Sequence, residues 1–231
     1  MKLSVDNVWA GYGGSQILRE MSFDVSSGEI VTIFGRNGSG RSTALKAIAG
    51  VITPKQGSIR FDGRELVGLR PDSIAKAGVA YVPEDRQVFA SLTVEENLRL
   101  GESRRKGFWS TERVWKLFPR LLERKSVNAG FLSGGEQQML TICRSLVGNP
   151  NAILIDEPTE GLAPKVVAQV MDLISIIRRE GAAVVLVEQK TSFALSISDR
   201  AYVVGHGHMV FAGSPADLQC NEQIRQTWLE V

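Results

Sequence analysis

The sequence predicts an α/β protein built on a mostly parallel sheet. Four short apolar runs rich in β-branched residues carry no charge, as in strands that are covered on both faces. They lie at 30–34, 79–82, 153–155 and 184–187. Helical periodicity separates them and is clearest at 164–180, where Pro164 suits the first turn and Gly181 the stop. Strands that alternate with helices are typical of a parallel sheet.

Shorter strands are expected outside these runs. The first 28 residues predict strands around the turn-rich segment 11–15, and 58–61 predicts another that ends at Asp62-Gly63. A hairpin is predicted where 202–204 is joined to 209–211. His206 and His208 lie in its turn; a metal pair is conceivable, but no third ligand lies nearby in sequence, so the turn interpretation is preferred.

Composition limits the class of protein. With 231 residues, 43% of them apolar and 23% charged, the chain can form a core, which excludes disorder as its main state. The net charge of +2 does not suggest a nucleic-acid coat protein. The uncharged apolar stretch 181–187 is far shorter than the ~18 residues of a membrane span. No secretory signal is recognised, and Cys143 and Cys220 suggest no disulfide framework, so we expect a soluble chain in a reducing compartment.

One segment differs in composition from the remainder. Residues 99–125 contain nine Lys or Arg and three Asp or Glu, with Trp109, Trp115 and Phe118 among them. This pattern predicts a helical subdomain inserted between segments of the sheet. Its basic side chains suit a solvated helical face, or alternatively a surface that meets anionic lipid or a membrane partner.

A glycine-rich turn follows the strand predicted at 30–34 and precedes a helix. It reads Gly35, Arg36, Asn37, Gly38, Ser39, Gly40, Arg41, Ser42 and Thr43. The spacing matches GxxxxGK[ST], in which backbone N–H groups converge on phosphate at a helix N-terminus and the hydroxyl of Ser42 is placed to bind magnesium. A plain strand-to-helix turn is the alternative. We therefore expect this loop to bind nucleotide.

Arg41 departs from the motif, which has lysine at this position. Lysine is a compact charge that folds back over the loop, whereas arginine is longer, planar and forked. The positive charge is kept, so we expect nucleotide binding to survive and the positioning of the γ-phosphate to change.

Two adjacent carboxylates end the strand predicted at 153–155. Asp156 and Glu157 lie where ligands collect in open α/β sheets. Asp156 is a candidate to hold magnesium, and Glu157 is a candidate general base for an attacking water. A solvated turn is the alternative for the segment alone, but a phosphate loop in the same chain makes the catalytic interpretation the better one.

A further motif opens an amphipathic helix after Leu132. It consists of Ser133, Gly134, Gly135 and Glu136. With the glycine loop and the acidic strand end, it makes the chain resemble the ATP-binding subunits of ABC transporters over essentially all 231 residues. The resemblance implies a P-loop NTPase core with an antiparallel β subdomain at 1–29 and 56–70 and a helical subdomain at about 90–145. It also implies that ATP, with Mg²⁺, lies between the loop of one subunit and the Ser-Gly-Gly motif of a second.

The family also implies roles for single residues. Tyr12 corresponds to the aromatic that stacks on adenine, and a turn tyrosine is its alternative. Glu84 takes the place of the usual Q-loop glutamine, where a carboxylate can approach magnesium but donates no hydrogen bond. Gln189 occupies the switch position, which is histidine in most members, so no catalytic histidine is expected.

Other residues narrow the resemblance to the second ATPase subunit of branched-chain amino acid importers, whose relatives serve urea and short amides. These residues are the segment 160–164, the Val-Glu-Gln of the switch and the segment 89–98. Arg41 and Lys190 depart from that group. The implied partners are a second ATPase subunit, identical or different, two membrane permeases and indirectly a solute-binding protein, with no nucleic acid. The implied location is the cytoplasmic face of the bacterial inner membrane. A nucleotide-gated dimerisation module with weak hydrolysis is the alternative that Arg41 favours.

Overall fold

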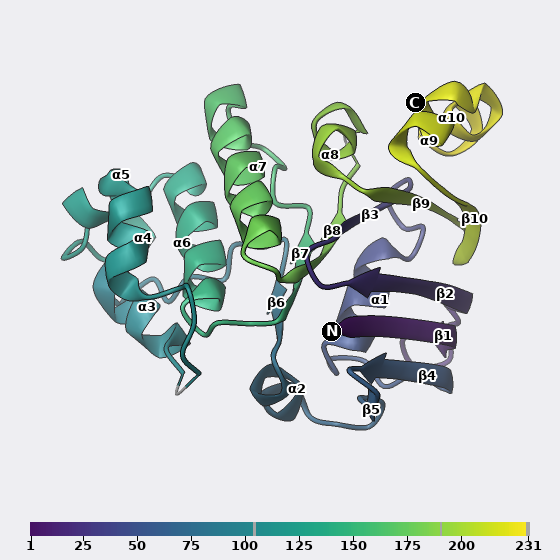
Figure 1. Cartoon of the computed structure of the whole chain (residues 1–231), viewed down its shortest axis with the longest axis horizontal. Coiled ribbons are helices and arrows are strands. Elements are labelled where there is room, and N and C mark those ends of the chain that lie inside the picture. Colours follow the sequence, from purple (N-terminus) through teal and green to yellow (C-terminus); the bar gives the residue numbers. More distant parts are fainter. Residues whose placement is uncertain (104, 190, 230–231) are drawn as a thin grey trace.

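A six-stranded sheet passes through the centre of the molecule (Figure 1). The computed structural model describes residues 1–103, 105–189 and 191–229. In sheet order the strands are β10 (His208–Gly213), β9 (Arg200–Gly205), β3 (Ile30–Phe34), β8 (Ala183–Val187), β7 (Ala152–Asp156) and β6 (Val79–Val82). Neighbouring strands are parallel except β9 and β10, which form the predicted hairpin. All four strands predicted from apolar runs are present, and the prediction of an α/β fold with a mostly parallel sheet is confirmed.

A second sheet of four antiparallel strands lies beside the first. In order the strands are β2 (Leu18–Ser26), β1 (Lys2–Ala10), β4 (Gln56–Phe61) and β5 (Arg64–Glu65). Buried and more exposed side chains alternate along much of β1 and β2, as in strands that cover a core with one face. The sheet therefore packs one of its faces inward.

The central sheet separates two hydrophobic cores. Side chains of β3 alternate between them: Ile30 and Phe34 belong to one core, and Val31 and Ile33 belong to the other. The second core also contains the buried residues of the antiparallel sheet and of helix α1 (Arg41–Ile48). Both faces of the sheet are thus covered, which explains why every residue of β3, β7 and β8 is buried.

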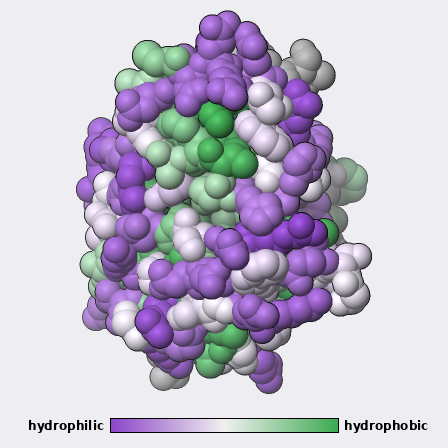
Figure 2. Space-filling view, turned by 90° about the vertical axis from the view of Figure 1, so that its right-hand side faces the viewer, coloured by the Kyte–Doolittle hydropathy of each residue, from purple (hydrophilic) through white to green (hydrophobic). Residues whose placement is uncertain are grey.

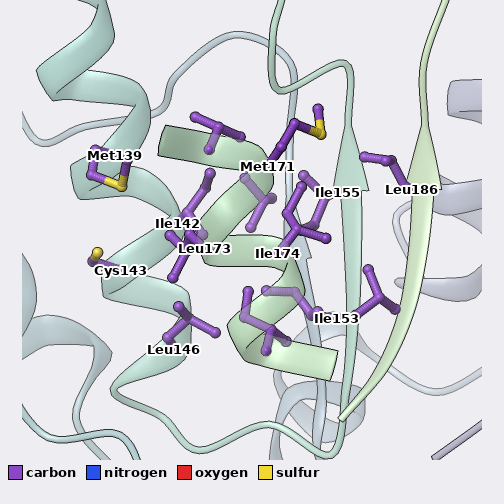
Figure 3. Packing of buried hydrophobic residues seen from close by; sticks show 14 of the residues in the cluster. Met139, Ile142, Cys143, Leu146, Ile153, Ile155, Met171, Leu173, Ile174 and Leu186 are labelled. Carbon is purple, nitrogen blue, oxygen red and sulfur yellow. The ribbon is translucent and has the colours of Figure 1, made fainter. Parts of the chain in front are cut away.

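Helices cover the face that bears the first core. Figure 3 shows α7 (Pro164–Arg179) between α6 (Gly134–Leu146) and the sheet, with apolar side chains from all three in contact. Leu146 on α6 and Ile174 on α7 are fully buried, as is Ile153 on β7. The predicted helix at 164–180 therefore exists, and its apolar stripe is core.

The remaining helices complete the fold. On the left of Figure 1, α6 is accompanied by α3 (Val94–Gly101), α4 (Thr111–Leu117) and α5 (Pro119–Glu123). The short 3-10 helix η1 (Ala129–Phe131) precedes α6 in the chain. Elsewhere are α2 (Pro71–Ala77), α8 (Thr191–Ile197), α9 (Pro215–Cys220) and α10 (Glu222–Trp228). Across the described residues, no helix combines the length and the apolar character that crossing a bilayer requires.

Several basic side chains of the 99–125 segment have partners within the subunit. Arg99 pairs with Glu95, and Arg120 pairs with Glu123. The guanidinium of Arg105 bonds to Asn151 and to a backbone carbonyl. A part of the local positive charge is therefore balanced or hydrogen-bonded inside the subunit.

The surface is largely polar where it can be seen from the side of the antiparallel sheet. Figure 2 shows that this face is mostly hydrophilic, with a hydrophobic strip framed by polar side chains. Phe89 and Leu100 are each more than half exposed and line one groove. Exposed apolar side chains at a groove are typical of surfaces that associate with other proteins.

Asn97 fixes the loop that leads from the central sheet into the helices. Its side chain is fully buried, and its amide donates to the carbonyls of Phe89, Leu92 and Thr93 while its oxygen accepts the N–H of Phe89. Thr93 and Glu96 add a capping box at the start of α3. The side chain of Asn97 is the acceptor for the N–H of Phe89, and it adds a second hydrogen bond to carbonyls that already accept a backbone N–H.

Asn97→Ala should lower the free energy of unfolding by about 2 kcal/mol, because the N–H of Phe89 and the guanidinium of Arg144 lose an acceptor and three hydrogen bonds to carbonyls are lost with a buried side chain. Urea unfolding followed by circular dichroism measures this. The control is Gln87→Ala, an exposed change in the same loop that should stay within about 0.5 kcal/mol of wild type. Equal stability of the two variants would contradict the assigned role of Asn97.

Candidate functional site

The glycine loop, residues 35–43, turns sharply between β3 and α1. Gly38 and Gly40 have positive φ angles of 79° and 112°. A Cβ atom on Gly40 would lie 2.8 Å from the side chain of Leu18, and one on Gly35 would lie 2.5 Å from the carbonyl oxygen of Val204. Larger residues at these two positions would therefore disturb the loop.

The loop delivers a helix N-terminus to the site. Gly40 is the N-cap of α1 and provides no side-chain cap, and the first turn contains no acidic residue. The first backbone N–H groups of α1 thus have no side-chain acceptor at the cap, and they carry the partial positive charge of the helix dipole. This arrangement favours an anion.

The turn between β9 and β10 supports the loop from behind. The N–H of Gly207 donates to the carbonyl of Ser39 over 2.9 Å, and the carbonyl of Gly207 accepts from the N–H of Arg19. A Cβ atom on Gly207 would lie 1.9 Å from the carbonyl oxygen of Ile17. The sequence predicted this turn but gave no sign that it holds the glycine loop in place.

Arg41 is buried under the loop. Its side chain is 4% exposed, and its Nη2 lies 2.5 Å from Oε1 of Glu157 and 3.0 Å from Oδ1 of Asn37. Its Nη1 is buried without a hydrogen-bond partner. The guanidinium therefore pairs with the predicted general base and has donor capacity left over.

Asp156 ends β7 and receives two hydroxyl groups. Ser42 donates to Oδ1 over 2.9 Å, and Tyr81 donates to Oδ2 over 3.2 Å. Burial raises the pKa of Asp156, and these hydrogen bonds oppose the shift. The structure thus joins the glycine loop to the strand end, and it adds Tyr81, which sequence reasoning missed.

Three further carboxylates converge on the same edge. Glu84, Glu157 and Glu160 offer oxygen atoms that lie within 4.8 Å of one another. Burial raises the pKa of Glu157, and Arg41 opposes it; burial and the neighbouring Glu160 raise the pKa of Glu84. Oxygen atoms from carboxylates and a serine are the donors that Mg²⁺ prefers, so Ser42 and the acidic groups fit this cation.

A cavity of about 290 Å³ connects these groups. It is lined by Ile17, Asn37, Gly38, Gly40, Arg41, Ser42, Thr43, Glu84, Glu157 and Glu160. Its volume is near the lower end of the range for small-molecule sites, which is about 300–1,000 Å³. The combination of a helix N-terminus, one buried cation and several carboxylates suits an anionic ligand accompanied by a divalent cation.

Other predicted residues do not line this cavity. Gly35, Arg36 and Ser39 belong to the loop but lie outside the lining, and Tyr12 is 50% exposed. Gln189 is half-buried directly after β8. Lys190 lies outside the described residues. The roles of these side chains toward a ligand stay predictions.

The Ser-Gly-Gly motif lies at the start of α6, away from the cavity lining. Glu136 accepts from the N–H and the hydroxyl of Ser133, which forms a capping box. Burial acts to raise the pKa of Glu136, but the hydrogen bonds from Ser133 outweigh it and hold this pKa below its ordinary value. Within this subunit, Glu136 therefore caps its own helix, and a contact with a ligand stays a prediction for Ser133, Gly134, Gly135 and Glu136.

Arg86 joins this motif to the acidic loop and was missed by sequence reasoning. Its φ of 45° is unusual for a residue with a side chain. Its Nη2 donates to the carbonyl of Glu160 over 2.7 Å, and a Cβ atom on Gly134 would lie 2.4 Å from its Nη1. The guanidinium thus lies between the start of α6 and the loop after β7.

Glu188 was also missed, although its neighbour Gln189 was singled out. Its carboxylate is buried and accepts from both the N–H and the hydroxyl of Thr159, over 3.2 and 2.7 Å. These bonds fix the loop that carries Glu157 and Glu160. Burial raises the pKa of Glu188, against the hydrogen bonds from Thr159.

Comparisons with known proteins agree with this geometry. The model of the ABC transporter family matches residues 18–160. The chain is 45% identical to the high-affinity branched-chain amino acid transport ATP-binding protein BraG of Pseudomonas aeruginosa, over 98% of this chain and 99% of BraG. It is 37% identical to the probable branched-chain amino acid transport ATP-binding protein LivF of Archaeoglobus fulgidus, over 96% of each. The solved ADP conformation of an ATP-binding cassette of an ABC transporter shares the fold, with a TM-score of 0.85 at 24% identity over 98% of each chain.

Glu188→Gln should raise stability at neutral and alkaline pH, because it removes a buried charge and keeps an acceptor for Thr159. A raised pKa means that the folded state holds the proton more tightly, so this contribution to stability is lost as pH rises above 4.5 and through the raised value. The urea midpoint of the variant should exceed that of wild type at about pH 8, and the gap should shrink toward about pH 4. Glu180→Gln, an exposed change, is the control, and a gap independent of pH would refute the explanation.

Proposed function

This chain belongs to the ABC transporter family, and from that premise we propose that it is the ATP-hydrolysing subunit of an importer for branched-chain amino acids. The observation that carries this proposal is that the glycine loop and Glu157 line one cavity, with Asp156 hydrogen-bonded to Ser42 of that lining. The specific cargo rests on BraG and LivF, which the chain resembles over nearly its whole length.

The loop binds the phosphates of the substrate ATP. Backbone N–H groups of 35–43 and the first turn of α1 surround the anion, and Arg41 adds a positive charge. Tyr12 stacks on adenine. The motif Ser133-Gly134-Gly135-Glu136 of a second subunit closes over the same nucleotide.

Ser42 and Asp156 hold Mg²⁺ in this proposal, with Glu84 beside them. When bound, the cation neutralises phosphate charge. Ser42 and Asp156 already lie 2.9 Å apart, joined by a hydrogen bond that the cation would replace.

Glu157 acts as the general base. Its carboxylate takes a proton from water while the water oxygen forms a bond to the γ-phosphorus, and the bond from that phosphorus to the bridging oxygen breaks, which releases ADP. Gln189 offers an amide hydrogen bond to the γ-phosphate. Since an amide does not titrate near neutral pH, Gln189 orients the γ-phosphate without exchanging a proton with it.

Binding of ATP closes a dimer, because the nucleotide contacts both subunits only in the closed state. We propose a second ATPase subunit, identical or different, two permeases and indirectly a solute-binding protein as partners, at the cytoplasmic face of the bacterial inner membrane. The helical subdomain, about 90–145, transmits this closure to the permeases. The antiparallel subdomain comprises 1–29 and 56–70. Support comes from a groove of about 990 Å³ beside the helical subdomain, where Phe89 and Leu100 are exposed.

Uptake tests the cargo. A strain that lacks this chain should lose high-affinity uptake of radiolabelled leucine, isoleucine and valine and regain it when the wild-type chain is restored. Retained uptake of these amino acids together with lost uptake of urea or acetamide would move the proposal to the urea and short-amide importers.

A nucleotide-gated module with weak hydrolysis is the second candidate. The observation that favours it is the ion pair between Arg41 and Glu157, which engages the general base. Retention of both Asp156 and Glu157 at the strand end favours the enzyme.

Glu157→Gln should reduce phosphate release by the assembled transporter about 100-fold or more, because no group then accepts the proton of water. A malachite-green assay with Mg²⁺ and ATP measures release. Calorimetry with the same variant should still show nucleotide binding. Equal, near-zero release by wild type and variant would support the module instead.

Arg41→Lys should raise turnover roughly threefold to tenfold with little change in nucleotide affinity, because a compact ammonium restores the positioning for which the loop is shaped. Steady-state phosphate release and calorimetry separate the two effects. The exposed Arg36→Lys in the same loop is the matched control. Turnover at or below the wild-type rate would count against this explanation of Arg41.

A further inference from the structure

The pair formed by Arg41 and Glu157 differs from the other ion pairs of the described residues. Its two side chains are 4% and 9% exposed, whereas each of the other pairs has at least one partner that is more than a quarter exposed. Removal of one partner from a buried pair leaves an uncompensated charge. Each group therefore needs a counter-charge as long as it stays buried.

The groups around Arg41 allow Glu157 and a bound phosphate to compete for its guanidinium. Glu84 and Glu160 line the same cavity as Glu157, so the edge holds several carboxylates close together. The Nη2 atom of Arg41 is engaged by Glu157 and Asn37, while Nη1 is buried and has no partner. A phosphate group offers oxygen atoms to both arms of a guanidinium, which a single oxygen of Glu157 does not.

We propose that Arg41 acts as a latch on Glu157. In the nucleotide-free subunit, Glu157 is the counter-ion of the guanidinium; a bound polyphosphate takes the guanidinium over, and only then is the carboxylate of Glu157 available to accept a proton from water. This inference rests on the proposed function, since it concerns the same site, and it adds a control of that site by its own ligand.

The latch follows from the shape of arginine. A planar fork reaches the carboxylate at the end of β7 from the first residue of α1 while Asn37, in the loop, holds the same nitrogen atom. Once the guanidinium turns to phosphate, the carboxylate oxygen of Glu157 that it held is free to accept a hydrogen bond from water. Arg41 is thus a positioning residue for the general base as well as a ligand for phosphate.

Nuclear magnetic resonance of arginine side chains tests the pair directly. In protein labelled with ¹⁵N-arginine, the Arg41 guanidinium signal is assigned by its loss in Arg41→Lys. We expect this signal to shift when the β,γ-imido analogue of ATP and Mg²⁺ are added to wild type, and to be shifted in nucleotide-free Glu157→Gln. A signal that is the same in wild type and Glu157→Gln, or that keeps its paired position at saturation with the analogue, would overturn the latch.

Affinity gives a second test with a matched control. Because Glu157 competes with phosphate for Arg41, Glu157→Gln should tighten binding of the analogue about tenfold, whereas Glu160→Gln, which removes a carboxylate from the same cavity without touching Arg41, should tighten it less than about threefold. Calorimetry on monomeric protein, verified by light scattering, measures both. Equal effects of the two variants, or weaker binding by Glu157→Gln, would show that Glu157 does not compete.

These outcomes are separate from those that test the function. Absence of binding of the analogue by wild type and by both variants would sink the proposed nucleotide site. Binding with an unchanged Arg41 signal would sink the latch alone. The wild-type titration needs no substitution, so the test does not depend on the folding of a variant.

Discussion

A single buried guanidinium faces three buried carboxylates at the C-terminal edge of the central sheet. Arg41 lies among Asp156, Glu157 and Glu188, and burial raises the pKa of each carboxyl group. Burial of an unpaired charge is energetically costly. Carboxylates at this edge are therefore destabilising when alone and much less so when they share a cation. In the proposed mechanism, a bound anion and a divalent cation change this balance of charge, so that ligand binding is coupled to hydrolysis.

The fold supplies the rigidity that such a charge cluster needs. The glycine loop is held from behind by Gly207, and the loop after β7 is held by Glu188 through Thr159 and by Arg86 at Glu160. These supports come from parts of the chain far from the residues they position. The site is therefore set by tertiary contacts around a few local motifs.

The sequence was informative wherever a function is encoded locally. The glycine loop is one continuous segment, Asp156 and Glu157 are neighbours in sequence, and strands such as β3 and β8 are recognised from uninterrupted apolar runs. Tyr81, Arg86 and Glu188 act on residues 75, 74 and 29 positions away, so no local pattern reveals them. The segment 89–98 was noted only for its family resemblance. In the structure, the side chain of Asn97 in this segment donates hydrogen bonds to backbone carbonyls of the same loop, which sequence alone does not reveal.

In the proposed mechanism, residues 41 and 189 together determine how the site is controlled. With Gln189 at the switch position, that position offers no group that titrates near neutral pH. In the proposed latch, Arg41 exchanges one anionic partner for another. If the latch operates as proposed, Glu157 accepts a proton from water only when Arg41 holds phosphate in its place. With lysine in the loop and histidine at the switch position, phosphate binding and proton exchange would belong to two residues. In this chain, the proposed control of Glu157 depends on one ion pair.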